Sequence, residues 1–191
     1  MGRSSRDKWD RIYADADWPA PARVVRENEH LLPSRGRALE VACGLGANAL
    51  LLARRGLAVT AWDFSPVAVD RLRRRAESEG LPLRAEVRDV TVDPWPPEAW
   101  DVIVVSRFLD RSVCAAMRKA LKPGGLLLYQ TFVRNPVTPA GPSNPAYRLA
   151  ENELLRLFSG LIVRAYREEG HCGDRCRGWR DEAYLVAQKP M

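Results

Sequence analysis

The sequence predicts an α/β protein with a Rossmann-like, doubly wound and mostly parallel seven-stranded sheet that closes with a C-terminal antiparallel strand pair. Two patterns predict this class. From residue 37 onward, apolar runs of strand length alternate with longer amphipathic segments, which is typical of βαβ units. Near the carboxyl end, two β-like segments are joined by a polar, Gly-containing loop, which indicates an antiparallel pair.

The length of 191 residues suits one well-buried α/β domain and is short for two. Within this single domain we expect an N-terminal helical cap over residues 1–36, a cofactor-binding core over 37–131, and an acceptor-side loop, helix and strand pair over 132–191. No apolar run approaches the roughly 20 residues of a membrane span, and the first residues lack the apolar stretch of a secretory signal. We therefore expect a cytoplasmic protein with no membrane partner.

The first two βα units have a strand-turn-helix pattern, and helix-capping residues mark the start of the second helix. Strand 38–43 leads into helix 48–55, and strand 57–62 leads into a second helix that begins after Ser65. Serine is a typical N-cap, and Pro66 suits the first helical turn because its φ is already near the helical value. The strand-turn-helix order is therefore clear at both places.

The later elements keep the same alternation. The run at 100–106 is apolar almost throughout, as expected for a strand covered on both faces. A Pro-rich turn at 93–97 precedes it, and the segment Lys122-Pro123-Gly124-Gly125 predicts a turn before the fifth strand. The other predicted elements are a strand at 83–87, a helix at 111–121, a strand at 126–131, a long loop at 135–145, a helix at 151–158 and β-like segments at 161–168 and 182–189.

A Gly-rich turn joins the first strand to its helix. Gly44 and Gly46 allow the backbone to turn sharply and to approach a ligand, and the helix that follows directs unpaired N–H groups toward a negative group. The spacing Gly44-x-Gly46-x-x-Ala49 also satisfies the relaxed dinucleotide fingerprint. The turn by itself therefore fits two classes of cofactor.

Acidic residues follow the second and third strands. Asp63 stands about twenty residues beyond the glycines, where a carboxylate accepts hydrogen bonds from ribose hydroxyls; the alternative is a helix-capping role. Asp89 is placed to accept a hydrogen bond from an adenine amino group, against the alternative of an ordinary solvated loop residue.

At these residues the sequence resembles the class I S-adenosylmethionine-dependent methyltransferases, in particular the small stand-alone members of the tellurite-resistance and thiol or thiopurine type. Residues 39–48, LEVACGLGAN, match the first motif of that family, 59–66, VTAWDFSP, match the second, and 121–125, LKPGG, match the turn before the fifth strand. The resemblance implies S-adenosylmethionine as the cofactor. It predicts these cofactor-binding residues: Tyr13, Ala42, Cys43, Gly44, Gly46, Asn48, Asp63, Phe64, Asp89, Val90, Ser106 and Arg107.

Two positions depart from the pattern of the family. Ala42 stands where many members have Gly or Asp, although alanine is small enough to allow close approach. Residues 106–109, SRFL, replace the proline-containing tetrapeptide of many amine- or nucleic-acid-methylating members. The catalytic residues are therefore unknown from the sequence, and His30 and His171 are lone histidines with no visible partner.

Charge and cysteine content exclude other classes of site. The net charge is +6, but the arginines are dispersed, and no named nucleic-acid motif is present, so a nucleic-acid partner is not expected. His171, Cys172 and Cys176 resemble part of a zinc site, but a structural zinc site has four ligands, and Cys114 is distant in sequence. We predict no metal.

The predicted function is transfer of a methyl group from S-adenosylmethionine to a small-molecule acceptor: a thiol, a metalloid oxyanion or a small metabolite. Trp9 and Tyr13 are candidates for a lid over the cofactor sulfonium, because aromatic faces attract cations; the alternative is ordinary packing of an amphipathic helix. The loop at 135–147 is expected to flank the acceptor. Two alternatives stay open: an NAD(P)-dependent reductase that uses the G-x-G-x-x-A turn, and a catalytically inactive cofactor-binding protein. The sequence does not predict an oligomeric state.

Overall fold

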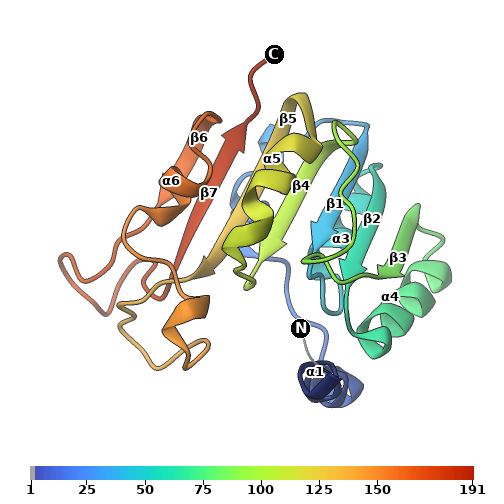
Figure 1. The fold of residues 1–191 in the computed structure, drawn as a ribbon, viewed down its shortest axis with the longest axis horizontal. Coiled ribbons are helices and arrows are strands. Elements are labelled where there is room, and N and C mark those ends of the chain that lie inside the picture. The colour runs from blue at the N-terminus through green and yellow to red at the C-terminus, as the bar shows by residue number, and fades with distance from the viewer. Residues whose placement is uncertain (1–2) are drawn as a thin grey trace.

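A single seven-stranded sheet forms the centre of the protein. The computed structural model describes the backbone of residues 3–191 and the side chains from Arg6 onward. The strands are β1 (Arg37–Val41), β2 (Ala58–Asp63), β3 (Leu83–Val87), β4 (Trp100–Ser106), β5 (Leu121–Phe132), β6 (Ile162–Arg167) and β7 (Glu182–Gln188). Their order in the sheet is β3-β2-β1-β4-β5-β7-β6, with parallel pairing up to β5 and antiparallel pairing of β7 with both β5 and β6 (Figure 1). The predicted fold class is confirmed.

Helices lie on both faces of this sheet and across one of its edges (Figure 1). Residues 1 and 2 of the predicted N-terminal cap lie outside the described residues. The helices are α1 (Arg3–Asp15), α2 (Arg23–Glu27), α3 (Ala47–Arg54), α4 (Pro66–Ser78), α5 (Cys114–Ala120) and α6 (Glu153–Leu157), with 3-10 turns η1 (Glu29–Leu31), η2 (Arg111–Val113) and η3 (Pro145–Tyr147). Among the described helices, none is both long and apolar enough to cross a membrane.

The core consists of two hydrophobic layers, because successive side chains of a strand point to opposite faces of the sheet. Ala38 and Val102 pack with α2, α3 and α4. Their neighbours Leu39 and Ile103 pack with α5 and α6 on the other face. Burial on both faces explains why the central strands are apolar almost throughout.

The capping prediction for α4 is confirmed. The Ser65 side chain accepts a hydrogen bond from the amide of Ala68 at 3.2 Å, and Pro66 is the first residue of the helix. This bond satisfies one of the amides that have no partner inside the first turn.

The segment around the fifth strand differs from the prediction. The predicted turn at 122–125 lies inside β5 as a bulge: Leu121 pairs with Trp100, Leu126 pairs with Val102, and the residues between them loop out. Gly124 supplies the left-handed conformation that the bulge needs, with φ of 75°. Because Leu121 is already paired in the sheet, the helix predicted at 111–121 ends at Ala120, and its first turn is the 3-10 turn η2.

Four arginines hold irregular segments together by donating to backbone carbonyls. Arg148 binds the carbonyls of residues 133, 140 and 142 in the long loop after β5, and Arg180 binds those of 170, 172, 174 and 177 in the loop between β6 and β7. Arg111 and Arg71 act in the same way at η3 and at the end of α1. These four arginines therefore serve loop structure, because a planar guanidinium offers five donors.

Candidate cofactor-binding site

The Gly-rich turn after β1 forms a buried cradle at the carboxyl edge of the parallel strands. Gly44 and Gly46 have φ values of 53° and 73°, and Gly46 is the N-cap of α3. Ala42 also has a positive φ, 51°. This is the left-handed region, which costs a non-glycine residue roughly 1–2 kcal/mol, so the glycine that many relatives have there has a physical reason.

Several backbone amides of this cradle lack an acceptor, and two of them begin helix α3. The side chain of Glu40, in the middle of β1, accepts from the amide of Ala49 and from Asn48 Nδ2, each at 2.7 Å. Ala47 and Asn48 are buried, yet within residues 3–191 their amides donate to no acceptor. Unpaired amides at a helix N-terminus bind a negative group, so these residues fit the carboxylate of an amino-acid-bearing cofactor.

Asp63 connects the end of β2 to the cradle. Its side chain is 4% exposed, and its two oxygens accept hydrogen bonds from the amides of Gly44 at 2.7 Å and Ser65 at 2.9 Å. Burial raises the pKa of the Asp63 carboxyl, although these backbone bonds oppose the rise. Ser65, not Asp63, caps α4. The ribose role of Asp63 stays a prediction. Its carboxylate also holds the amides of Gly44 and Ser65 in place.

The residues after β2 and β3 lie beside one another, since the amide of Arg88 donates to the carbonyl of Asp63 at 2.8 Å. Asp89 accepts from the amide and hydroxyl of Thr91, at 3.0 and 2.6 Å. Burial raises the pKa of Asp89 and the bonds from Thr91 lower it, and the net pKa lies below its usual range. Val90 is buried, and Phe64 is half-buried beneath the guanidinium of Arg6.

The end of β4 connects the cradle to a second region. Asn48 Nδ2 also donates to Ser106 Oγ at 3.1 Å, so Ser106 lies at the cradle. The next side chain, Arg107, forms an ion pair with Glu182 at the start of β7, on the other side of β5. The structure thus separates two adjacent residues that were predicted to share one role.

Helix α1 lies across the carboxyl edge, over the cradle (Figure 1). A Cβ placed on Gly44 would come within 2.9 Å of the Tyr13 hydroxyl. The helix is fastened at two points: Ser65 Oγ donates to Asp10, and Arg71 donates to the carbonyls of Tyr13, Ala14 and Ala16. The predicted amphipathic helix therefore covers the candidate site, and its residue Tyr13 touches the Gly-rich turn.

The Tyr13 and Cys43 side chains are held in their neutral forms. Burial, and after it the charge of Asp63, raises the pKa of both the phenol and the thiol. The thiolate of Cys43, which is the reactive form of cysteine, is thus disfavoured in this buried position. Trp9 stacks on Tyr13 with ring centroids 5.5 Å apart.

Replacing Tyr13 with alanine should weaken binding of S-adenosylmethionine about 3- to 10-fold and should weaken binding of S-adenosylhomocysteine less, because only the first carries a sulfonium that an aromatic face attracts. Titration calorimetry with both ligands measures the difference. Ile12→Ala is the matched control, since Ile12 lies on the same helix and is exposed. Equal losses for the two ligands would show that Tyr13 only packs.

Several residues of this site were missed by sequence reasoning. Glu40 carried a signal, a single charge inside an apolar strand, but Gln130 and Glu182 did not, because each resembles an ordinary polar residue of a strand. Asp10 and Arg71 gain their role only when α1 reaches α4.

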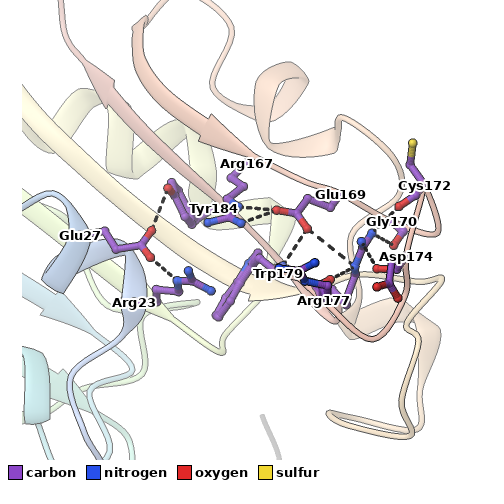
Figure 2. Close-up of polar contacts among 11 residues, drawn as sticks. Arg23, Glu27, Arg167, Glu169, Gly170, Cys172, Asp174, Arg177, Trp179 and Tyr184 are labelled. Atoms are coloured by element: carbon purple, nitrogen blue, oxygen red, sulfur yellow. Dashed lines mark hydrogen bonds and ion pairs between the residues drawn. The ribbon is translucent and has the colours of Figure 1, made fainter.

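The loops after β5 and β6 enclose a separate cleft of about 550 Å³ at the same edge of the sheet. His171 lines this cleft, and its Nε2 lies 3.2 Å from the carbonyl of Pro136. Cys172 and Cys176 are exposed free thiols in the same loop, and His30 is exposed in η1. Figure 2 shows how this loop is tied to the body: Glu169 accepts from the amide of Trp179 and pairs with Arg167.

Comparison with known proteins agrees with this geometry. A family model described as a methyltransferase domain matches residues 38–125, from β1 to the bulge in β5. The demethylmenaquinone methyltransferase of Thermus thermophilus is 32% identical over 133 residues, which cover 66% of this chain and 59% of that protein. Residues 38–125 thus form a methyltransferase domain, and the resemblance to the class I S-adenosylmethionine-dependent methyltransferases is confirmed.

Two further proteins are similar to this chain, one in sequence and one in fold. The ubiquinone biosynthesis O-methyltransferase of Azotobacter vinelandii is 32% identical over 126 residues, covering 61% of this chain and 53% of that protein. The chain thus spans a little over half the length of these two curated relatives. The crystal structure of TehB from Haemophilus influenzae has the same fold, with a TM-score of 0.73 at 24% identity, covering 95% of this chain and 67% of that one.

Proposed function

We propose that the chain transfers a methyl group from S-adenosylmethionine to a small-molecule acceptor. The observation that carries this proposal is the pair of buried, unpaired amides at Ala47 and Asn48 in a Gly-rich cradle. Asp63 and Asp89 follow at the next two strand ends. Such a set supplies a site for the amino-acid end, the ribose and the adenine of one cofactor, in that order along the sheet.

The residues of the chain have a limited chemical task. The cofactor supplies an already activated methyl group, so the protein must hold the acceptor in line and exclude water. The Gly-rich turn and α3 hold the cofactor, and α1 with Tyr13 covers it from solvent. Neither histidine lies at the cradle in the described structure, so we assign no general base.

The enclosure of the site favours a small acceptor. Helix α1 covers the cradle, and the loops that Arg148 and Arg180 organise line the same edge beside it. Thiols, metalloid oxyanions and small metabolites fit this space, and quinols join the candidates because two relatives are named for quinone methylation. Docking of a folded nucleic acid would need a wide open surface at this edge.

Titration calorimetry with S-adenosylmethionine and with NADH tests the cofactor. We expect binding of the first and none of the second. Tight NADH binding without S-adenosylmethionine binding would favour the reductase alternative. For the acceptor, a screen of small thiols, oxyanions, quinols and tRNA with radiolabelled methyl donor separates the candidates, and clear methylation of tRNA would contradict the preference for small molecules.

Replacing Asp63 with alanine should weaken binding of S-adenosylmethionine by about 1.5 to 3 kcal/mol, the usual value of hydrogen bonds to a charged group. The reason is loss of the ribose contact together with loosening of the Gly44 amide that Asp63 holds. Calorimetry measures the affinity, and circular dichroism checks the fold. Asp70→Ala, which removes an exposed carboxylate from α4, is the control. A folded Asp63 variant with unchanged affinity would remove this residue from the site.

A further inference from the structure

Arg107 is held in an unusual backbone conformation at the end of β4. Its φ is 54°, in the left-handed region, and its amide donates to the carbonyl of Gln130 at 2.9 Å. A non-glycine residue keeps such a conformation only where its surroundings determine it, and such residues gather at functional sites. The side chain of Arg107 is thereby aimed along the carboxyl edge toward β7.

A chain of buried polar groups orients the Arg107 guanidinium. Its Nε donates to Glu182 Oε1 at 3.1 Å, and Glu182 is only 7% exposed. The other oxygen of Glu182 accepts from Gln130 Nε2, and Gln130 Oε1 accepts from the amide of Val24 at 2.8 Å. Gln130 is 2% exposed. Burial of a carboxylate and an amide costs free energy unless both are hydrogen-bonded. Here Glu182 and Gln130 are hydrogen-bonded to each other, and together they fix the position of the exposed Arg107.

The outer edge of this guanidinium is free. The Arg107 side chain is 65% exposed, and neither Nη1 nor Nη2 has a hydrogen-bond partner in the part of the chain that the structure describes. In this it differs from Arg71, Arg111, Arg148 and Arg180, whose terminal nitrogens bind carbonyls. Two parallel N–H groups held in a plane match the two oxygens of a carboxylate.

The position of Arg107 separates it from the amino-acid end of the cofactor. The Gly-rich cradle follows β1, on one side of β4, whereas the Arg107 guanidinium is directed past β5 to β7, on the other side. The unpaired amides of Ala47 and Asn48 already offer donors to the cofactor carboxylate. The two terminal nitrogens of Arg107 are therefore available to bind a second molecule at this edge.

We propose that Arg107 binds a carboxylate of the methyl acceptor, and therefore that the acceptor is a small organic acid whose nucleophilic atom lies apart from that carboxylate. This inference rests on the proposed function. Glu182 and Gln130 act as positioning residues for Arg107, and Ser106, the residue before it, lies at the cofactor cradle. The anchored carboxylate would set the acceptor beside the transferred methyl group.

The test uses the full chain saturated with S-adenosylhomocysteine, with benzoate and its neutral isostere benzamide as probes in titration calorimetry. We expect benzoate to bind at least tenfold more tightly than benzamide. Arg107→Gln should abolish this preference, Arg107→Lys should keep part of it, and Arg84→Gln, at an exposed arginine on β3, should leave it intact. Equal binding of the two probes, or a preference that survives in Arg107→Gln, would overturn the proposal.

A second arm distinguishes the carboxylate of the acceptor from that of the cofactor. S-adenosylhomocysteine carries an amino-acid carboxylate, and methylthioadenosine does not. Both should bind Arg107→Gln as they bind the unchanged chain. A tenfold loss confined to S-adenosylhomocysteine would assign Arg107 to the cofactor and overturn the proposal. If the unchanged chain binds neither nucleoside, the proposed function itself fails, and the two failures are distinguishable.

Discussion

Replacing Gly46 with alanine is expected to lower the free energy of unfolding by about 2 to 5 kcal/mol. Two costs combine. The φ of 73° is strained for any residue with a Cβ, and the new Cβ would overlap the Leu72 side chain, 2.7 Å from its Cδ1. Leu72 is fully buried on α4 and has little freedom to move. Chemical denaturation of the cofactor-free chain measures the loss.

Gly80→Ala separates the two costs. Gly80 also has a positive φ, 61°, but an added Cβ would meet nothing within 4 Å. The free energy of unfolding of this variant should fall by only about 1–2 kcal/mol, the cost of the backbone strain. If both variants lose the same amount, contact with Leu72 plays no part, and the tight packing of the cradle against α4 is not a reason for glycine at position 46.

Raising the pH through the neutral range is expected to destabilise the cofactor-free chain because of Glu40. Burial raises the pKa of this carboxyl from 4.5 to about 8, although bonds from Asn48 and Ala49 oppose the rise. The folded state therefore holds a proton that the unfolded state has already lost. The stabilisation is complete below pH 4.5 and is lost as the pH rises to about 8. A pKa difference of this size corresponds to about 5 kcal/mol.

Glu40→Gln removes this titration. The free energy of unfolding of the variant, measured by denaturant titration from pH 5 to pH 9, should fall less steeply with pH than that of the unchanged chain. Its value at any single pH is less informative, because the glutamine NH₂ would face the donors of Asn48 or Ala49. Glu77→Gln, at an exposed position on α4, should leave the slope unchanged. An equal slope in all three proteins would show that Glu40 is ionised in the fold at neutral pH.

Local sequence signals were sufficient for the α/β architecture. β3 and β4 begin and end at the predicted residues: β3 alternates apolar and charged residues, and β4 is apolar almost throughout. The N-cap at Ser65 was also readable, since capping depends on neighbours in the chain. The turn at 122–125 was placed in β5 instead, because pairing of Leu121 with Trp100 extends the strand, and that contact joins residues distant in sequence.

What the sequence by itself determined was the fold class, the Gly-rich turn and the strand ends near Asp63 and Asp89, because each follows from spacing along the chain. The tertiary structure decided which side chains share a site. Tyr13 lies over Gly44, and Gln130 and Glu182 hold the Arg107 side chain. Ser106 contacts the cradle, whereas the side chain of its neighbour Arg107 points away from it. These contacts join residues up to 75 positions apart, and they depend on the order of strands in the sheet, which no local pattern contains.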